Sequence, residues 1–155
     1  ISSPEEQRPL EEKNFGTFWQ IAREKEHVAA VFEHRGLERT IAGLRKISPE
    51  KGQYGGQGWA NYATSYFNDC DRFLGALKRV LARGGTGVIV VGNSILQGVN
   101  IPVQDILGDI AKMRGLSVEG IYRLRDKRVG NSITASRGGT SKATLDESAV
   151  VVRKR

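Results

Sequence analysis

The chain has a single cysteine among its 155 residues, Cys70, and this scarcity excludes two classes of protein. One thiol forms no disulfide within the chain and cannot build a cysteine-based metal cluster. Cys70 shares a spacing of three and four residues with Phe67, Phe73 and Leu74. We therefore expect a buried core thiol rather than a nucleophile.

Long apolar runs are also missing. No stretch approaches the roughly 20 apolar residues that a helix needs to cross a bilayer, and no basic segment followed by an apolar one opens the chain. We therefore expect a cytoplasmic protein with no membrane partner.

The formal net charge is +7, and most of it lies near one end. Residues 123–155 contain nine Lys or Arg residues and three acidic ones, Asp126, Asp146 and Glu147. A one-sided basic surface is typical of proteins that bind polyanions such as nucleic acids. A solvated tail has the same composition, so charge alone favours neither interpretation.

An apolar run bounded by glycines lies near the middle of the chain. Residues 88–91, Val-Ile-Val-Val, have no polar alternation, which predicts a central strand buried on both faces, as in a parallel α/β sheet. The apolar residues before it recur at helical spacing, which predicts a helix packed on that sheet. They are Tyr66, Phe67, Cys70, Phe73, Leu74, Leu77, Val80 and Leu81.

Three further elements are predicted after that strand, which makes the fold class α/β. Pro102 suits the first turn of a helix, and Gly115 stands where a C-terminal glycine cap belongs. Residues 116–124 alternate as a half-buried strand does, and residues 148–152 supply a short apolar strand. Between these strands, residues 125–142 are rich in basic residues and glycine, which favours a long hairpin loop.

The first third of the chain predicts helices. Residues 3–6, Ser-Pro-Glu-Glu, suit a capped helical turn. Residues 14–44 have helical apolar spacing with a polar break, and Gly36 interrupts or ends the helix. His27 and His34 would share one side of it, but no acidic or cysteine cluster joins them. Because a metal needs three or four converging ligands, we predict no metal site.

Glycine punctuates residues 48–62, where four glycines fall within eleven residues. This density predicts a mobile loop outside any helix or strand. Tyr54 and Trp59 are large aromatic residues for a loop. Two interpretations stay open: the rings fold back on the core, which is favoured, or they stack on an unpaired base.

Several short motifs accompany this order of elements. Residues 73–85 read Phe-Leu-Gly-Ala-Leu-Lys-Arg-Val-Leu-Ala-Arg-Gly-Gly, 88–94 read Val-Ile-Val-Val-Gly-Asn-Ser, Gly98 precedes Ile-Pro at 101–102, 125–128 read Arg-Asp-Lys-Arg, and 147–154 read Glu-Ser-Ala-Val-Val-Val-Arg-Lys. In these features residues 64–155 resemble the C-terminal half of the Rossmann-like, S-adenosylmethionine-dependent DNA methyltransferases that modify an exocyclic amino group of adenine or cytosine. The Val-Gly-Asn-Ser strand end and the Glu-Ser-X-Val-Val ending are the more particular of these motifs.

The resemblance implies a mixed sheet with a final antiparallel strand, S-adenosylmethionine as the cofactor and DNA as a partner. It divides the chain into a helical and glycine-rich loop region, residues 1–63, and the C-terminal half of a methyltransferase-like domain, residues 64–155. Two family motifs are absent from the sequence: the Phe-X-Gly-X-Gly turn that cradles the cofactor and the Pro-Pro-Tyr motif that holds the target amino group. We therefore expect no catalytic residue within 1–155 and a cofactor site mostly outside this chain.

A missing N-terminal half, a partner subunit or self-association is expected to complete the sheet, because an unpaired strand edge favours association. The resemblance also implies a contact with an extruded base, since such enzymes act on bases taken out of the stack and hold the strand by its phosphates. The candidate nucleic-acid-binding residues are Arg125, Lys127, Arg128, Asn131, Ser132, Arg137 and Lys142.

The predicted function is that of a fragment or subunit of a site-specific DNA methyltransferase, which transfers a methyl group from S-adenosylmethionine to an exocyclic base amino group. The chain alone is expected to be inactive. An RNA amino-methyltransferase is one alternative, and a non-catalytic nucleic-acid-binding module with the same half-fold is another.

Overall fold

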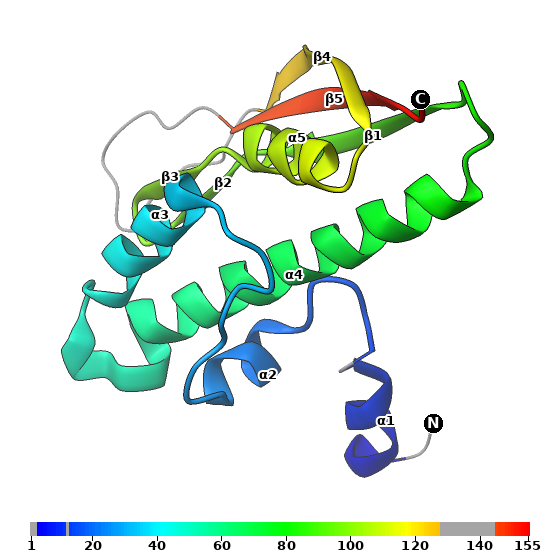
Figure 1. Ribbon diagram of the computed structural model, residues 1–155. Coiled ribbons are helices and arrows are strands. Elements are labelled where there is room, and N and C mark those ends of the chain that lie inside the picture. Colours follow the sequence, from blue (N-terminus) through cyan, green and yellow to red (C-terminus); the bar gives the residue numbers. More distant parts are fainter. Residues whose placement is uncertain (1–2, 12, 128–144) are drawn as a thin grey trace. The chain divides into compact units, whose positions relative to one another are not determined.

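The computed structural model describes residues 3–11, 13–127 and 145–155. Its contacts divide the chain into two compact units, Ile1–Asp69 and Cys70–Arg155. Helix α4, Gly56–Val80, contributes to both units (Figure 1). The sequence predicts a boundary between residues 63 and 64, and the observed boundary lies between Asp69 and Cys70. Both positions fall within α4. Among the described residues, no helix combines the length and the apolar character needed to cross a membrane.

The first unit is helical. Its elements before α4 are α1, Pro4–Glu11, α2, Trp19–Glu24, α3, Arg35–Arg45, and a short 3-10 helix, η1, Pro49–Tyr54. The predicted cap of α1 is confirmed, because the Glu6 N–H donates to Ser3 Oγ at 3.3 Å. The core of this unit is formed by the buried residues Ile21, Ala22, Leu37, Leu44, Ala60, Ala63 and Phe67.

Residues 14–18 and the segment between α2 and α3 are not helical, so the helix predicted over residues 14–44 is wrong in both places. Two buried asparagines of α4 hold the segment, each through one N–H and one C=O group of its backbone. The bonds are Val28 N–H to Asn61 Oδ1 (3.1 Å), Asn61 Nδ2 to Lys25 O (2.6 Å), Val31 N–H to Asn68 Oδ1 (2.9 Å) and Asn68 Nδ2 to Ala29 O (2.9 Å). Because the side chains of α4 satisfy these backbone groups, the segment needs no helix of its own.

Helix α4 begins at Gly56, inside the region predicted to be a glycine-rich loop, and that prediction is wrong. A Cβ atom at Gly56 would lie 1.7 Å from the Leu44 carbonyl oxygen, and one at Gly58 would lie 2.0 Å from that of Gln53. Only glycine fits such close approaches of two backbones. Lack of space accounts for Gly55, Gly56 and Gly58, whereas a Cβ atom at Gly52 would meet no atom within 4 Å.

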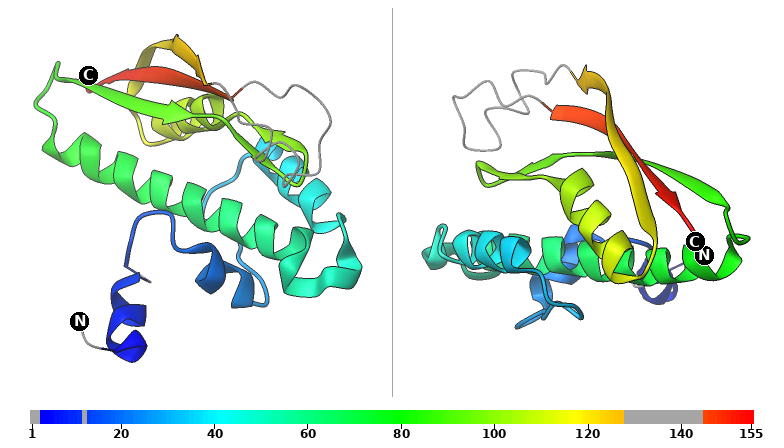
Figure 2. Two further views of the ribbon diagram at one scale, coloured as in Figure 1. Left: turned by 180° about the vertical axis from the view of Figure 1, so that it is seen from behind. Right: turned by 45° about the horizontal axis from the view of Figure 1, so that its top comes forward.

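The second unit contains a three-stranded sheet, and the fold is mixed α/β as predicted. The strands are β1, Thr86–Gly92, β4, Ser117–Lys127, and β5, Leu145–Arg153. Their order is β1-β5-β4, and β5 runs antiparallel to both neighbours (Figure 2). Strands β1 and β4 therefore run in the same direction. Helix α5, Val103–Met113, packs against all three strands.

The prediction that residues 88–91 form a central strand buried on both faces is wrong. Among the described residues, β1 pairs with β5 only, and Val88 and Val90 are 62% and 58% exposed. The central strand is β5, in which Val150 and Val152 are fully buried. The run in β1 has no polar alternation because its exposed positions are also valine.

Other predictions for this unit are confirmed. Helix α4 contains the predicted apolar stripe except Leu81, although Val80 at its end is exposed, and the Cys70 thiol is buried as predicted. Strands β4 and β5 form at the predicted positions and pair antiparallel, but β4 extends to Lys127, so the prediction that residues 125–127 belong to a loop is wrong. Helix α5 ends before Gly115, whose φ of 75° suits the residue after a helix C-cap.

A small hairpin after β1 was not anticipated. Strands β2, Ser94–Leu96, and β3, Val99–Ile101, pair antiparallel. Gln97 and Gly98 join them with φ values of 50° and 80°, as in the two-residue turns that match the twist of paired strands. A glycine between two short apolar runs was the available signal.

Candidate nucleic-acid interface

The candidate interface lies at the edge of the sheet where β1 and β4 end and β5 begins. Gly92 and Arg125 both pair with Glu147 of β5, and Asp126 pairs with Asp146. This edge also flanks residues 128–144, which lie outside the described residues. In α/β sheets, ligands bind beyond the carboxyl ends of the parallel strands, so we call this group of residues the carboxyl edge.

Two asparagine side chains and one backbone N–H group connect the elements at the carboxyl edge. Asn93 follows β1, and its Oδ1 accepts the N–H of Asp146 at 2.9 Å, while its Nδ2 donates to Asn100 Oδ1 at 3.1 Å. The small hairpin is thereby joined to the end of β1 and the start of β5. The Oδ1 atom of Asp146 is buried and has no hydrogen-bond partner among the described residues.

The described basic side chains of this edge are paired with acids. Arg125 Nε lies 2.5 Å from Glu147 Oε2, and Arg123 pairs with Asp126 and lies 3.8 Å from Asp146. The hydrogen bond and charge of Glu147 raise the pKa of Arg125 above its ordinary value. Arg125 therefore remains a cation, but part of its hydrogen-bonding capacity is already used.

The structure describes two of the seven predicted nucleic-acid-binding residues. Arg125 is exposed near the end of β4, and Lys127 is the last residue of that strand. The other five lie outside the described residues: Arg128, Asn131, Ser132, Arg137 and Lys142.

The two candidate stacking residues belong to the first unit. Trp59 stacks on Trp19, with 4.0 Å between the ring centroids and 16° between the planes, and meets Tyr62 edge to face. Tyr54 is exposed, and the Arg23 guanidinium lies 4.4 Å from its ring centroid. Trp59 thus folds back on its own unit, as the favoured interpretation expects.

Asn93, Asn100 and Arg123 make polar contacts at the carboxyl edge and were not among the predicted site residues. Asn93 had a signal, because polar residues directly after a strand often line a site. Arg123 and Asn100 had none, since only the register of the strands brings them near Asp146 and Asn93.

The two histidines lie in different surroundings. His34 caps α3, with its Nδ1 accepting the N–H of Leu37 at 2.9 Å, and His27 is exposed. Within the part of the chain that the structure describes, no three His, Cys, Asp or Glu side chains converge on one point.

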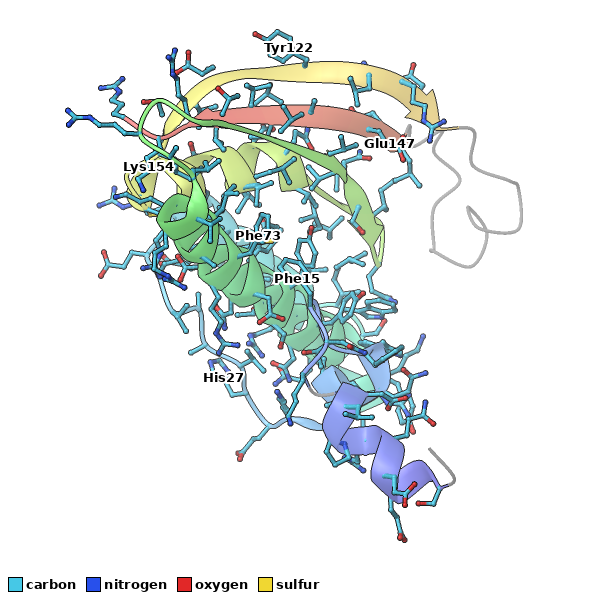
Figure 3. The ribbon with its side chains drawn as sticks, turned by 90° about the vertical axis from the view of Figure 1, so that its right-hand side faces the viewer. Phe15, His27, Phe73, Tyr122, Glu147 and Lys154 are labelled. Atoms are coloured by element: carbon cyan, nitrogen blue, oxygen red, sulfur yellow. The ribbon has the colours of Figure 1, made fainter. Side chains whose placement is uncertain are left out.

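One face of the sheet is open among the described residues. In antiparallel pairs, residues directly opposite share a face of the sheet. Val88 is opposite Val151, and Val90 and Tyr122 are both opposite Ala149, so these residues lie on the same face. Tyr122 is 56% exposed and lies on the side away from α5 (Figure 3). We call Val88, Val90, Val151 and Tyr122 the open face.

Comparisons with known proteins add no relative, because no family model, no curated protein and no solved structure matches the chain.

Proposed function

We propose that this chain supplies the C-terminal half of a DNA amino-methyltransferase and acts together with a second polypeptide segment that carries the cofactor turn and the Pro-Pro-Tyr motif. The pair would transfer a methyl group from S-adenosylmethionine to an exocyclic amino group of a base. In this arrangement the chain contributes the end of the sheet and the nucleic-acid contact, and its partner contributes the catalytic motif and most of the cofactor site.

The observation that carries the proposal is the unfinished side of the sheet. Among the described residues, β1 has a strand partner on one edge only, and its valines at 88 and 90 are exposed. A strand with one free edge and an apolar face is suited to pairing with a further strand. The side of the sheet at β4 is different, because residues 121–126 are exposed and include charged side chains.

The strand directions agree with the motifs that suggested the family. The resemblance implies a final strand antiparallel to the rest of the sheet, and β5 has this property toward both neighbours. Arg125 is exposed at the carboxyl edge, so a basic side chain lies on the side of the sheet at which ligands of α/β folds bind. These features support the proposal without identifying the target base.

Reconstitution tests the proposal. The chain alone is expected to bind no S-adenosylmethionine at micromolar concentration and to transfer no methyl group. Adding a polypeptide with both missing motifs is expected to restore cofactor binding, measured by calorimetry, and transfer of a tritiated methyl group to DNA. A parallel assay with RNA distinguishes the two nucleic acids as substrates.

Variants of the free edge show whether β1 is the contact. V88K and V90K place charges on exposed positions of an edge strand, which is how natural sheets prevent strand addition, so both are expected to abolish reconstitution. V80K is the matched control, because Val80 is 79% exposed at the end of α4 and lies outside the sheet. Tight cofactor binding by the chain alone contradicts the proposal, and association without methyl transfer favours a non-catalytic nucleic-acid-binding module.

A further inference from the structure

A second group of basic side chains lies at the opposite end of the sheet from the carboxyl edge. It consists of Lys78 and Arg79 in the last turn of α4, Arg83 in the connection to β1, and Arg153 and Arg155 at the end of β5. Figure 3 shows the two ends of β5, marked by Lys154 at one and Glu147 at the other. We call these five residues the amino-end rim.

Backbone contacts bring the rim residues together. The Gly84 N–H donates to Lys154 O at 2.8 Å, and the Lys154 N–H donates to Gly85 O at 3.0 Å. Arg153 pairs in register with both Thr86 and Ser117, and its Nε donates to Gly84 O at 3.1 Å. The end of β5 is thereby fixed beside the residues that connect α4 to β1.

Contacts around the end of α5 extend the same surface. A Cβ atom at Gly115 would lie 2.6 Å from Lys78 Nζ, so this lysine reaches the turn after α5. Arg155 and Lys112 line a hollow of about 590 Å³ together with residues 115–119. The rim residues therefore lie around the ends of α4, α5 and β5.

The rim differs from the carboxyl edge in its charge balance. None of its five cations forms an ion pair with a described carboxylate, whereas Arg123 and Arg125 at the carboxyl edge are both paired. The nearby acids Asp71 and Asp109 are occupied by Arg114 and Lys112, and Glu119 is the carboxylate of the hollow. The rim thus has uncompensated positive charge.

Helix capping accounts for only part of this charge. Cations in the last turn of a helix stabilise its carbonyl groups and dipole, which explains Lys78 and Arg79 and also Lys154, whose Nζ donates to Leu81 O at 2.8 Å. Arg83 and Arg155 lie outside any helix, and both are exposed. Four of the five rim residues are arginines, whose planar guanidinium suits two-point contact with phosphate.

We propose that the amino-end rim binds the phosphate backbone of a nucleic acid, without reading its sequence, as a second contact distinct from residues 125–142. The choice of a nucleic acid over other polyanions rests on the proposed function, but the contact does not depend on methyl transfer. Its role would be to hold a nucleic acid on the second unit while a more specific contact forms elsewhere.

Fluorescence anisotropy with a short labelled DNA duplex, titrated over a range of salt concentrations, tests the proposal on the full chain. The triple variant R79Q/R83Q/R155Q removes three exposed cations that make no hydrogen bond among the described residues. We expect its plot of log affinity against log salt to flatten by about 0.9 for each phosphate that the variant no longer binds. Thermal unfolding of the variant is expected to change only slightly, because Arg79 alone among the three lies in the last turn of a helix.

The matched control is R35Q/K46Q/K51Q, which removes three exposed positive charges from the first unit. An unchanged slope is expected for this control. An equal flattening in both variants, no flattening in the rim variant, or no binding of duplex by the original chain overturns the proposal. An RNA duplex and anionic lipid vesicles serve as further arms: similar binding of both duplexes supports a phosphate-backbone contact, and binding of vesicles alone overturns it.

Methylation by the reconstituted pair separates this inference from the proposed function. If the rim variant keeps the salt slope but the original pair methylates DNA, the rim inference is wrong and the proposed function stands. If the slope flattens but no partner restores methyl transfer, the rim inference stands without the proposed function.

Discussion

Asp71 on α4 and Arg114 at the end of α5 form a two-point ion pair in the second unit. Arg114 Nε donates to Asp71 Oδ1 at 2.5 Å, and Arg114 Nη2 donates to Asp71 Oδ2. The two partners differ in environment, because the side chain of Asp71 is 3% exposed and that of Arg114 is 45% exposed. The pair therefore joins the start of the unit to the end of α5 with one buried and one half-solvated charge.

Removing either partner is expected to have unequal effects. R114A leaves a buried carboxylate without its cation and is expected to cost about 3 kcal/mol of stability. D71A returns a half-exposed guanidinium to water and is expected to cost about 1 kcal/mol. Hydrogen exchange of the β5 backbone amides, followed by mass spectrometry, measures both changes within the second unit.

The control for this pair is K112A, which breaks the exposed Lys112–Asp109 pair. Exposed pairs contribute little, so a change within about 0.5 kcal/mol is expected. Equal destabilisation by R114A and D71A would contradict the assignment of Asp71 as the buried partner.

The pH dependence of the same contribution follows from the pKa of Arg114. The hydrogen bond to Asp71 raises this pKa in the folded chain. A raised basic pKa gives stability that is fully present below the unfolded-state value and is lost only as pH rises through the folded-state value, which for arginine is strongly alkaline. We therefore expect the stability difference between the original chain and R114A to stay constant from about pH 7 to about pH 9. A progressive decrease across this range would show that another group titrates with the pair.

The asparagine contacts of α4 give a prediction for the first unit. N68L removes the side-chain partners of the Val31 N–H and the Ala29 carbonyl. Both bonds are part-buried, and the loss of a typical hydrogen bond costs about 0.5–1.5 kcal/mol, so a destabilisation of about 1–3 kcal/mol is expected. Both tryptophans of the chain, Trp19 and Trp59, lie in this unit, so their fluorescence during urea unfolding reports on it.

T40A is the control for N68L. The Thr40 hydroxyl is exposed and bonds only to the carbonyl of Gly36, one turn earlier in α3. Its removal is expected to change stability by less than about 0.5 kcal/mol. Equal unfolding midpoints for N68L and the original chain would mean that solvent can satisfy the segment that Asn68 holds.

Local signals were sufficient to predict much of the second unit. The apolar stripe of α4, Pro102 and Gly115 around α5, and the alternation in β4 each depend on residues close in sequence, so their elements could be located before the structure was known. The position of β1 in the sheet could not, because it depends on which strands pair with β1, and the burial of Val88 depends on what packs on the open face. That information is not local to the strand.

The first unit was harder to predict because its structure depends on distant partners. Residues 25–34 have helical spacing, yet Asn61 and Asn68 from α4 hold them extended. At the carboxyl edge, Asp146 and Asn93 are 53 residues apart and meet only through the strand register. In both cases the local structure depends on a hydrogen bond between residues far apart in the sequence, which a local pattern of residues does not reveal.

The glycines before α4 provide a direct test of the packing argument. G56A would place a methyl group 1.7 Å from the Leu44 carbonyl oxygen, and such overpacking against backbone is expected to cost about 3 kcal/mol or more. G43A is the matched control, because a Cβ atom there has no neighbour within 4 Å. In the helix α3 it is expected to be neutral or to stabilise by up to about 1 kcal/mol. Tryptophan fluorescence in urea measures both, and a tolerated G56A would restore the interpretation of this region as a loop.

The pairing of Arg125 with Glu147 predicts that an acidic residue limits the nucleic-acid contact at the carboxyl edge. E147Q removes the carboxylate that lies 2.5 Å from Arg125 Nε, and the arginine remains a cation with its hydrogen-bonding groups available. If Arg125 then contacts a phosphate, DNA affinity rises and the slope against log salt steepens by about 0.9. R125Q is expected to abolish this gain when combined with E147Q.

E24Q is the control, because it removes the same charge from the exposed Arg8–Glu24 pair of the first unit. A gain of affinity in E147Q but not in E24Q supports a phosphate contact at Arg125. Equal gains in both would mean that net charge alone controls binding, because neither substitution would then act through its own arginine.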